Sequence, residues 1–228
     1  MTMSSNECEP RSEDLRLAFG FIADPQARAD VLVLFALLEA LRDIPGRVSE
    51  PLIGEIRLRW WYEAFEEIRD GRPVRYHPLT EAIQRLIGQY GLDPQDLMDM
   101  VEGQMPILDR TLNLRDAVKV VDAGEGAITG LAARMLDKTA QAEAVAKSAR
   151  LAGLVSLVGN SLLPMADLGP EEFAHLLRDA RTEAKSLSST LMPLALPAVA
   201  ARARWEGKAA NPLTLRLKLF WGFVTSRI

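Results

Sequence analysis

The sequence predicts a single all-α domain, and three observations lead to that fold class. The chain has 228 residues, 48% of them hydrophobic, which suffices for one substantial core and does not require two domains. Prolines stand before several segments whose apolar residues recur at three- and four-residue intervals, as at the first turn of amphipathic helices. No segment shows the alternating pattern of strands joined by tight turns. We therefore expect a helical bundle.

The expected helices follow one another along the chain. Prolines preceded by capping or turn residues predict helix starts at Pro25, Pro51, Pro78, Pro94, Pro170 and Pro212. Two more helices are expected over 114–136 and 140–157, giving about eight in all. The first of these contains Gly124, Gly126 and Gly130, each costing up to about 1 kcal/mol relative to alanine in a helix interior. We expect another helix or an elongated ligand to approach closely there, with a kinked helix as the alternative.

The N-terminal residues 1–23 are polar at their start and predict a flexible tail ahead of one helical domain over 24–228. They lack both the basic start and apolar run of a secretory signal and the Arg-rich composition of a transit peptide. Cys8 is the single cysteine, which fits a reducing compartment. No uncharged apolar run approaches the roughly 20 residues that span a bilayer. We expect a cytoplasmic protein.

Charge and motif patterns exclude several function classes. The net charge is −4 and the pI is about 5.4, with basic and acidic residues interleaved, so no nucleic-acid partner is expected. His77 and His175 are the only histidines and predict neither a metal-ligand pair nor a catalytic triad. No glycine-rich phosphate loop follows a strand pattern. The last segment, 211–228, mixes Arg216 and Lys218 with leucines and aromatics, so it either packs on the domain or lies at the inner face of a membrane.

The stretch "VSEPLIGEIRLRWWYEAFEEI", residues 48–68, resembles the squalene/phytoene synthase family, and residues 77–103 continue the match as the family's next helix pair. The resemblance implies the isoprenoid-synthase fold, a helical bundle around a central cavity. It is nearest to a divergent branch that includes a mitochondrial assembly factor for respiratory complex I, which implies a protein partner from such a complex. The matching core residues are Ser49, Glu50, Pro51, Gly54, Glu55, Arg57, Trp60 and Trp61.

The family's enzymes join two prenyl diphosphates head to head, with Mg²⁺ held between two acidic motifs on facing helices. The first motif, Asp-x-x-x-Asp, matches Glu39 and Asp43, whose spacing stacks both carboxylates on one helix face. Two interpretations are open: a residual metal or diphosphate contact, or an exposed acidic pair with Arg42 as neighbour. The second motif is expected within 153–160, yet no acidic residue lies between Glu143 and Asp167. The resemblance therefore implies a pseudoenzyme without a cofactor.

Two further features of the matching stretch leave alternatives open. Arg57 and Arg59 contact either a diphosphate or a partner, or they form surface salt bridges to Glu63 or Asp43. Trp60 and Trp61 cannot face the same way on a helix, so one belongs to the core and the other to a cavity or interface. The sequence does not distinguish them.

Three functions follow from these patterns. The first is a non-catalytic protein that binds a partner, as in assembly of a respiratory complex. The second is a Mg²⁺-dependent transferase on prenyl diphosphates that uses Glu39 and Asp43. The third is an isoprenoid or lipid binding protein, suggested by the glycines of 124–130 and by the apolar run 153–159.

Overall fold

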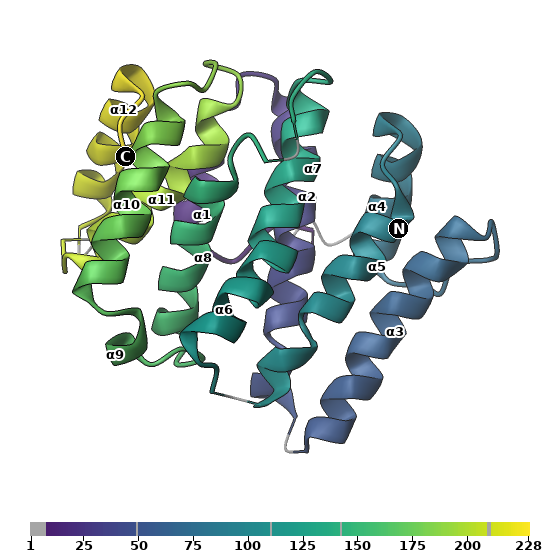
Figure 1. The fold of residues 1–228 in the computed structure, drawn as a ribbon. Coiled ribbons are helices and arrows are strands. Elements are labelled where there is room, and N and C mark those ends of the chain that lie inside the picture. The colour runs from purple at the N-terminus through teal and green to yellow at the C-terminus, as the bar shows by residue number, and fades with distance from the viewer. Residues whose placement is uncertain (1–7, 49, 110, 142, 209–210) are drawn as a thin grey trace.

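The computed structural model describes residues 8–48, 50–109, 111–141, 143–208 and 211–228, and in these ranges it contains helices and no strand. The all-α prediction is confirmed (Figure 1). The α-helices are α1 Glu13–Phe19, α2 Pro25–Arg42, α3 Pro51–Arg69, α4 Pro78–Tyr90, α5 Pro94–Gly103, α6 Leu114–Val121, α7 Ala127–Leu136, α8 Ala146–Gly159, α9 Met165–Leu168, α10 Pro170–Ala184, α11 Met192–Trp205 and α12 Pro212–Thr225. Short 3₁₀ turns lie at η1 Pro45–Arg47 and η2 Met105–Asp109, and a π-turn lies at η3 Asp122–Gly126.

Proline marks the helix starts as predicted. Each of the six prolines named above is the first residue of a helix. Before three of them, the side chains of Asp24, Asp93 and Asn211 accept a hydrogen bond of 2.9 Å from the backbone N–H two residues later. His77 caps α4 in the same way, because its Nδ1 accepts from that N–H at 3.1 Å. These bonds satisfy N–H groups that have no partner within the helix.

The predicted N-terminal tail is wrong for residues 13–19, which form α1. Ser12 caps this helix by accepting from the Leu15 N–H at 3.4 Å. Ala18 and Phe19 are fully buried, and the Phe19 ring lies 4.6 Å from the ring of Phe35 on α2. The apolar residues of this short helix therefore belong to the core, although polar residues precede them. Residues 1–7 lie outside the described ranges.

The helix expected over 114–136 is confirmed as one uninterrupted helical run, in which α6, the π-turn η3 and α7 follow one another directly. The close approach predicted at its glycines is found at Gly124, where an added Cβ would lie 3.0 Å from Leu38 Cδ1 and 3.1 Å from an Arg42 nitrogen. At Gly126 an added Cβ would meet nothing nearer than 3.8 Å. The helix expected to start at residue 140 begins at Ala146, and α11 was not predicted.

The helices form one bundle with α2 near its centre (Figure 1). α2 packs against α7 and α4, whereas α3 packs against α5 at one edge of the molecule. α8, α10, α11 and α12 form the opposite side, with α8 against both α10 and α11. Because α2 has neighbours on several sides, its residues 31–38 are all buried. This arrangement places α2 and α8 on two walls of one cavity.

Candidate functional site

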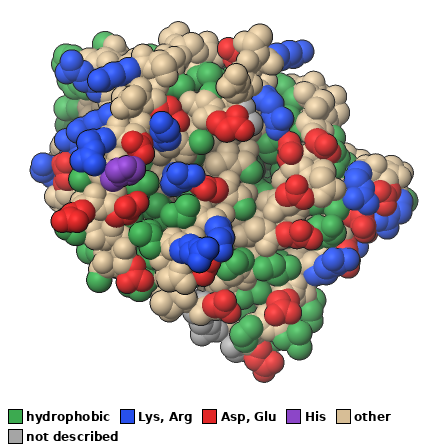
Figure 2. Space-filling view, in the orientation of Figure 1, with side chains coloured by type: hydrophobic (Ala, Val, Ile, Leu, Met, Phe, Trp, Pro, Cys, Tyr) green, Lys and Arg blue, Asp and Glu red, His purple; other side chains and the backbone are tan. Residues whose placement is uncertain are grey.

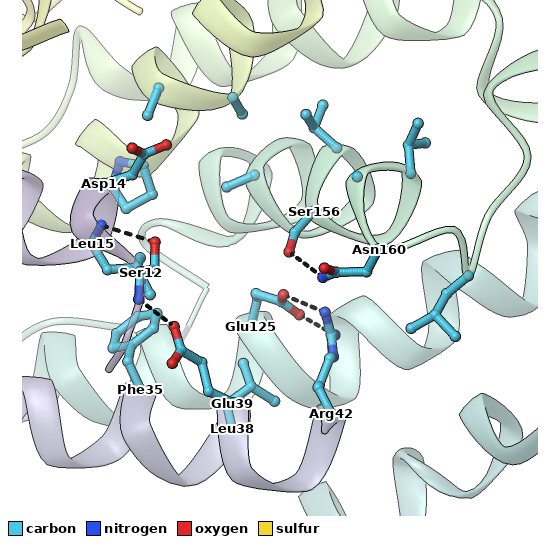
Figure 3. A pocket seen from close by; sticks show the side chains of 18 of the residues that line it. Ser12, Asp14, Leu15, Phe35, Leu38, Glu39, Arg42, Glu125, Ser156 and Asn160 are labelled. Atoms are coloured by element: carbon cyan, nitrogen blue, oxygen red, sulfur yellow. Dashed lines mark hydrogen bonds and ion pairs between the residues drawn. The ribbon is translucent and has the colours of Figure 1, made fainter. Parts of the chain in front are cut away.

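A cavity with a volume of about 830 Å³ lies between α2, η3, α8, α11 and the segment before α1 (Figure 3). One wall is mainly apolar and is formed by residues of α8 and α11, namely Ala149, Ala152, Val155, Val158, Leu194, Pro197, Ala200 and Ala201. The wall formed by α2 contains Phe35 and Leu38 and, towards the end of the helix, both residues of the predicted acidic motif. The cavity therefore combines an apolar space with charged groups at one end.

Glu39 and Asp43 line this cavity together, at the end of α2, as their four-residue spacing predicts. Glu39 accepts hydrogen bonds from the backbone N–H groups of Arg11, at 2.6 Å, and Ser12, at 3.1 Å. Asp43 forms ion pairs with the guanidinium groups of Arg11 and Arg47, the second at 2.9 Å. Their side chains are only 24% and 27% exposed. The segment before α1 thus covers the acidic pair and supplies it with donors.

The facing wall offers neutral groups where the second acidic motif is expected. Ser156 and Asn160 lie at this position, on and just after α8, and Asn160 Nδ2 donates to Ser156 Oγ at 3.4 Å (Figure 3). α8 contains no Asp or Glu. Neither an amide nor a hydroxyl carries the charge that would balance a divalent cation.

A buried ion pair crosses the same cavity and was not predicted from the sequence. Arg42 on α2 donates to both carboxylate oxygens of Glu125 on η3, through Nη1 at 2.7 Å and through Nη2 (Figure 3). Arg42 Nε donates to Gln104 Oε1 at 3.1 Å, and Gln104 Nε2 donates to the Val120 carbonyl at 3.1 Å. The side chains of the ion pair are 8% and 12% exposed. All three donor nitrogens of Arg42 are therefore used within the protein.

Burial and the facing arginine shift the pKa of Glu125 in opposite directions. Burial raises the pKa of Glu125 because it disfavours the charged carboxylate, and this effect exceeds the lowering by Arg42. A buried ion pair gains little net stability, but removal of one partner leaves the other charge without compensation. Arg42 and Glu125 therefore each need the other to compensate a buried charge.

Glycines on both sides make room for this ion pair. An added Cβ at Gly153 on α8 would lie 2.8 Å from Glu125 Cδ and 2.5 Å from Val121 Cγ1, distances that real Cβ atoms do not reach. Gly124, described above, borders Arg42 on the other side. The π-turn η3 carries Glu125 into the cavity, and such turns often occur at functional sites. The three glycines of 124–130 were the sequence signal that pointed to this segment.

No residue of the matching stretch of α3 lines the cavity of about 830 Å³. Glu50 is the residue before α3 and makes no side-chain capping bond, and Pro51 is the first residue of the helix. Gly54 is buried, and an added Cβ would lie 2.4 Å from Leu108 Cδ2, so glycine lets α3 pack closely on η2. Glu55 is exposed and lines a shallow groove on the outer side of α3. Ser49 lies outside the described residues.

The two tryptophans of α3 differ in burial. Trp61 is 7% exposed and belongs to the core, whereas Trp60 is half-buried. Both rings pack on His77, with centroids 6.0 Å away for Trp60 and 4.9 Å for Trp61. The guanidinium of Arg75 lies 5.5 Å from the Trp60 ring centroid. Trp60 lines the groove that Glu55 borders, so it has one face at the surface.

The two arginines of α3 have different surroundings. Arg59 forms the predicted surface salt bridge with Glu63, at 3.2 Å. Arg57 is exposed and lines a second cavity of about 550 Å³, together with Glu39, Asp43, Trp60 and Trp61. Within the described residues Arg57 forms no ion pair, so its predicted contact with a diphosphate or a partner stays a prediction.

A family model for squalene/phytoene synthase matches residues 10–161. This range covers two thirds of the chain and includes α1, the acidic pair, the buried ion pair and the facing residues Ser156 and Asn160. The chain belongs to the squalene/phytoene synthase family. No curated protein matches the chain. No solved structure matches it either.

Membership of the squalene/phytoene synthase family confirms the fold expected from α3 and its neighbours and raises the question of magnesium. In the described part of the chain, no three His, Cys, Asp or Glu side chains lie together as a metal site would require. Glu39 and Asp43 are already paired with arginines, and Glu125 is paired with Arg42. The residues present therefore do not fit the two-sided magnesium cluster that the family resemblance implies.

Proposed function

We propose that this protein is a family member that does not catalyse head-to-head condensation of prenyl diphosphates and that works by binding a partner protein. The observation that carries the proposal is that the carboxylates lining the cavity already have partners within the protein. Glu39, Asp43 and Glu125 each have a protein donor or cation as partner, and the facing wall has Ser156 and Asn160 in place of acids.

Departure of diphosphate requires positive charge close to its oxygens, which Mg²⁺ supplies when carboxylates hold it. A metal ion at the acidic pair would have to displace Arg11 and Arg47 from Asp43. Metal ions on the opposite side would meet only an amide and a hydroxyl. This arrangement supports a protein without the two-motif reaction.

An exposed apolar face on α3 supports the partner-binding role. Leu52 and Ile56 are each 62% exposed and Ile53 is 40% exposed, although α3 is a well-packed helix of the bundle. Beside them lies a groove of about 540 Å³ that contains Trp60 and Met105. Exposed apolar patches beside charged groups are typical of protein interaction sites, and an amphipathic helix of a partner fits such a groove.

The charges around this groove have both signs, with Glu55 and Asp109 near Arg59 and Arg75. Mixed charge matches a protein partner, which can present complementary groups of both signs. That the partner belongs to a respiratory complex is the part of the proposal that rests on the branch resemblance of the α3 sequence alone.

A second candidate function is binding of an isoprenoid or another lipid. It is favoured by the apolar wall that α8 and α11 contribute to the cavity of about 830 Å³. Pockets of this size with mostly apolar walls are typical of ligand sites. Such a ligand would not need a metal ion.

Thermal-shift titration with a non-hydrolysable farnesyl diphosphate analogue, with and without Mg²⁺, separates these functions, because a ligand of the native state raises Tm. We expect no rise that depends on Mg²⁺. A rise with the analogue that is the same without Mg²⁺ would support the lipid-binding candidate. A Mg²⁺-dependent rise that is lost in Asp43→Asn would contradict the proposal and support a transferase.

The partner role is tested by comparing Ile56→Glu with Met165→Glu in affinity capture from extracts of the protein's own cells. Met165 is 56% exposed on α9, which makes it a matched control for an exposed apolar residue. We expect a reproducible partner that Ile56→Glu loses and Met165→Glu retains. Equal capture by both variants would contradict binding through α3.

A further inference from the structure

One side of α12 exposes large apolar side chains that no other part of the described chain covers. They recur at intervals of three and four residues and lie within about 100° of the helix circumference, which makes them one continuous stripe. The members and their exposed fractions are Leu213 (65%), Leu217 (55%), Phe220 (50%), Trp221 (61%) and Val224 (57%). An apolar stripe of this kind on a soluble domain marks an interaction surface.

The opposite side of α12 is packed on the bundle, so the exposed stripe is not the inner face of an undocked helix. Leu215, Leu219 and Gly222 are buried. Gly222 lies against α11, since an added Cβ would be 3.0 Å from Val199 Cγ2. The ring of Phe223 stacks on Phe21 with centroids 5.0 Å apart. α12 therefore has two apolar sides, and the fold uses only one of them.

The charged side chains within the segment that carries the exposed stripe are all positive. Arg216 and Lys218 project on its two sides, because they lie one residue from Leu217 in opposite directions along the helix. Residues 207–228 contain Lys208, Arg216, Lys218 and Arg227 and no Asp or Glu, in a protein whose net charge is −4. Figure 2 shows hydrophobic and basic side chains at the upper left edge, where α12 lies in Figure 1, and acidic side chains lower on that edge.

We propose that this face of α12, the stripe with its flanking arginine and lysine, binds the surface of an anionic lipid bilayer. The helix would lie in the plane of the headgroups, with the stripe in the acyl boundary and the cations at the lipid phosphates. Tryptophan prefers this boundary, and Trp221, which is 61% exposed, belongs to the stripe.

The length of α12 fits this orientation and does not fit a span. Its 14 residues measure about 21 Å, whereas a bilayer core is about 30 Å thick. No helix of the described chain is long and apolar enough to cross a membrane.

The charges beside the exposed faces of α12 and α3 differ, and this difference favours lipid as the ligand of α12 and protein as the ligand of α3. The α3 face carries Glu55 among its exposed apolar residues and has acids and arginines around its groove. An acidic residue would be repelled by anionic lipid, whereas the α12 face has none. The membrane proposal is independent of the partner that α3 is proposed to bind.

Co-sedimentation of the full chain with phosphatidylcholine vesicles, with and without phosphatidylglycerol, tests the proposal. We expect binding to the anionic vesicles that weakens as salt rises, with a blue shift of the tryptophan fluorescence that Trp221→Phe abolishes. Trp221→Glu should lower the partition coefficient roughly tenfold or more. Arg216→Gln should lower it about fivefold, which corresponds to about 1 kcal/mol.

Tyr76→Glu is the matched control, because Tyr76 is an aromatic residue that is 75% exposed between α3 and α4 and belongs to neither proposed binding face. It should bind vesicles as the unchanged protein does. Absence of binding to anionic vesicles would overturn the proposal, and so would equal losses in Trp221→Glu and Tyr76→Glu. A dimer in solution that Trp221→Glu dissociates, without vesicle binding, would assign the face to a second copy of the chain.

Discussion

Replacing Arg42 by methionine removes the cation that faces Glu125 and keeps much of the side chain's apolar volume. Arg42 makes hydrogen bonds to Glu125 and Gln104, and the two charged side chains are 8% and 12% exposed. Loss of one partner of a buried ion pair costs about 3–5 kcal/mol. At about 2–4 °C per kcal/mol for a domain of this size, Tm should fall by roughly 6–20 °C.

The same variant should respond to pH in a defined direction. Without Arg42 the pKa of Glu125 rises further above its ordinary value, because burial then acts without the opposing charge. An acid with a raised pKa in the folded state takes up a proton on folding. The deficit in unfolding free energy of Arg42→Met should therefore be smaller near pH 5 than near pH 8. Urea denaturation at both pH values measures this difference.

A matched control and a double variant complete the test. Arg134→Met breaks the exposed ion pair with Asp96, whose side chains are 43% and 40% exposed, and should cost only about 0–1 kcal/mol. Arg42→Met combined with Glu125→Leu should recover most of the lost stability, because no unpaired charge remains. If Arg42→Met is no more destabilising than Arg134→Met, the charge of Glu125 does not need Arg42 as its partner and the reasoning is wrong.

Three further outcomes are expected. Gly153→Ala should lower the unfolding free energy measured by urea denaturation by about 1–3 kcal/mol, because the added methyl group overlaps the buried ion pair. Gly159→Ala on the same helix should be neutral or stabilising, because its methyl group contacts no other atom. Burial and the hydrogen bond to Asp30 raise the pKa of Tyr90 to about 12, so the absorbance of its phenolate should appear near pH 12. The stability that the protonated Tyr90 contributes is complete below pH 10 and is lost as the pH rises to 12. Hydrogen bonds from Arg202 and Lys208 lower the pKa of Glu206 to about 2, so the midpoint of its NMR titration should lie well below pH 4.5. The stability that the ionised Glu206 contributes is lost as the pH falls towards 2.

The sequence predicts those parts of this protein that depend on near neighbours in the chain. Helix starts follow from proline and a capping side chain within two residues. That Glu39 and Asp43 line one cavity follows from their spacing on α2. The absence of acids on α8 is visible in the sequence itself.

The rest depends on contacts between distant segments. Arg11 reaches Glu39 across 28 residues, and Arg42 reaches Glu125 across 83. No periodicity or cap encodes such pairs, so the segment before α1 was predicted as a free tail and Glu125 was not singled out. α11 was missed because Pro197 lies inside it, and proline normally predicts a helix end.

The most direct test of the central claim is incubation of the purified protein with farnesyl diphosphate and Mg²⁺, with measurement of released diphosphate and of condensed product. We predict no release above that of a protein-free control, because the wall facing Glu39 and Asp43 carries no carboxylate. Condensed product that requires Mg²⁺ and is lost in Asp43→Asn would contradict the account, since it would mean that the acidic pair holds a catalytic metal ion despite its arginine partners.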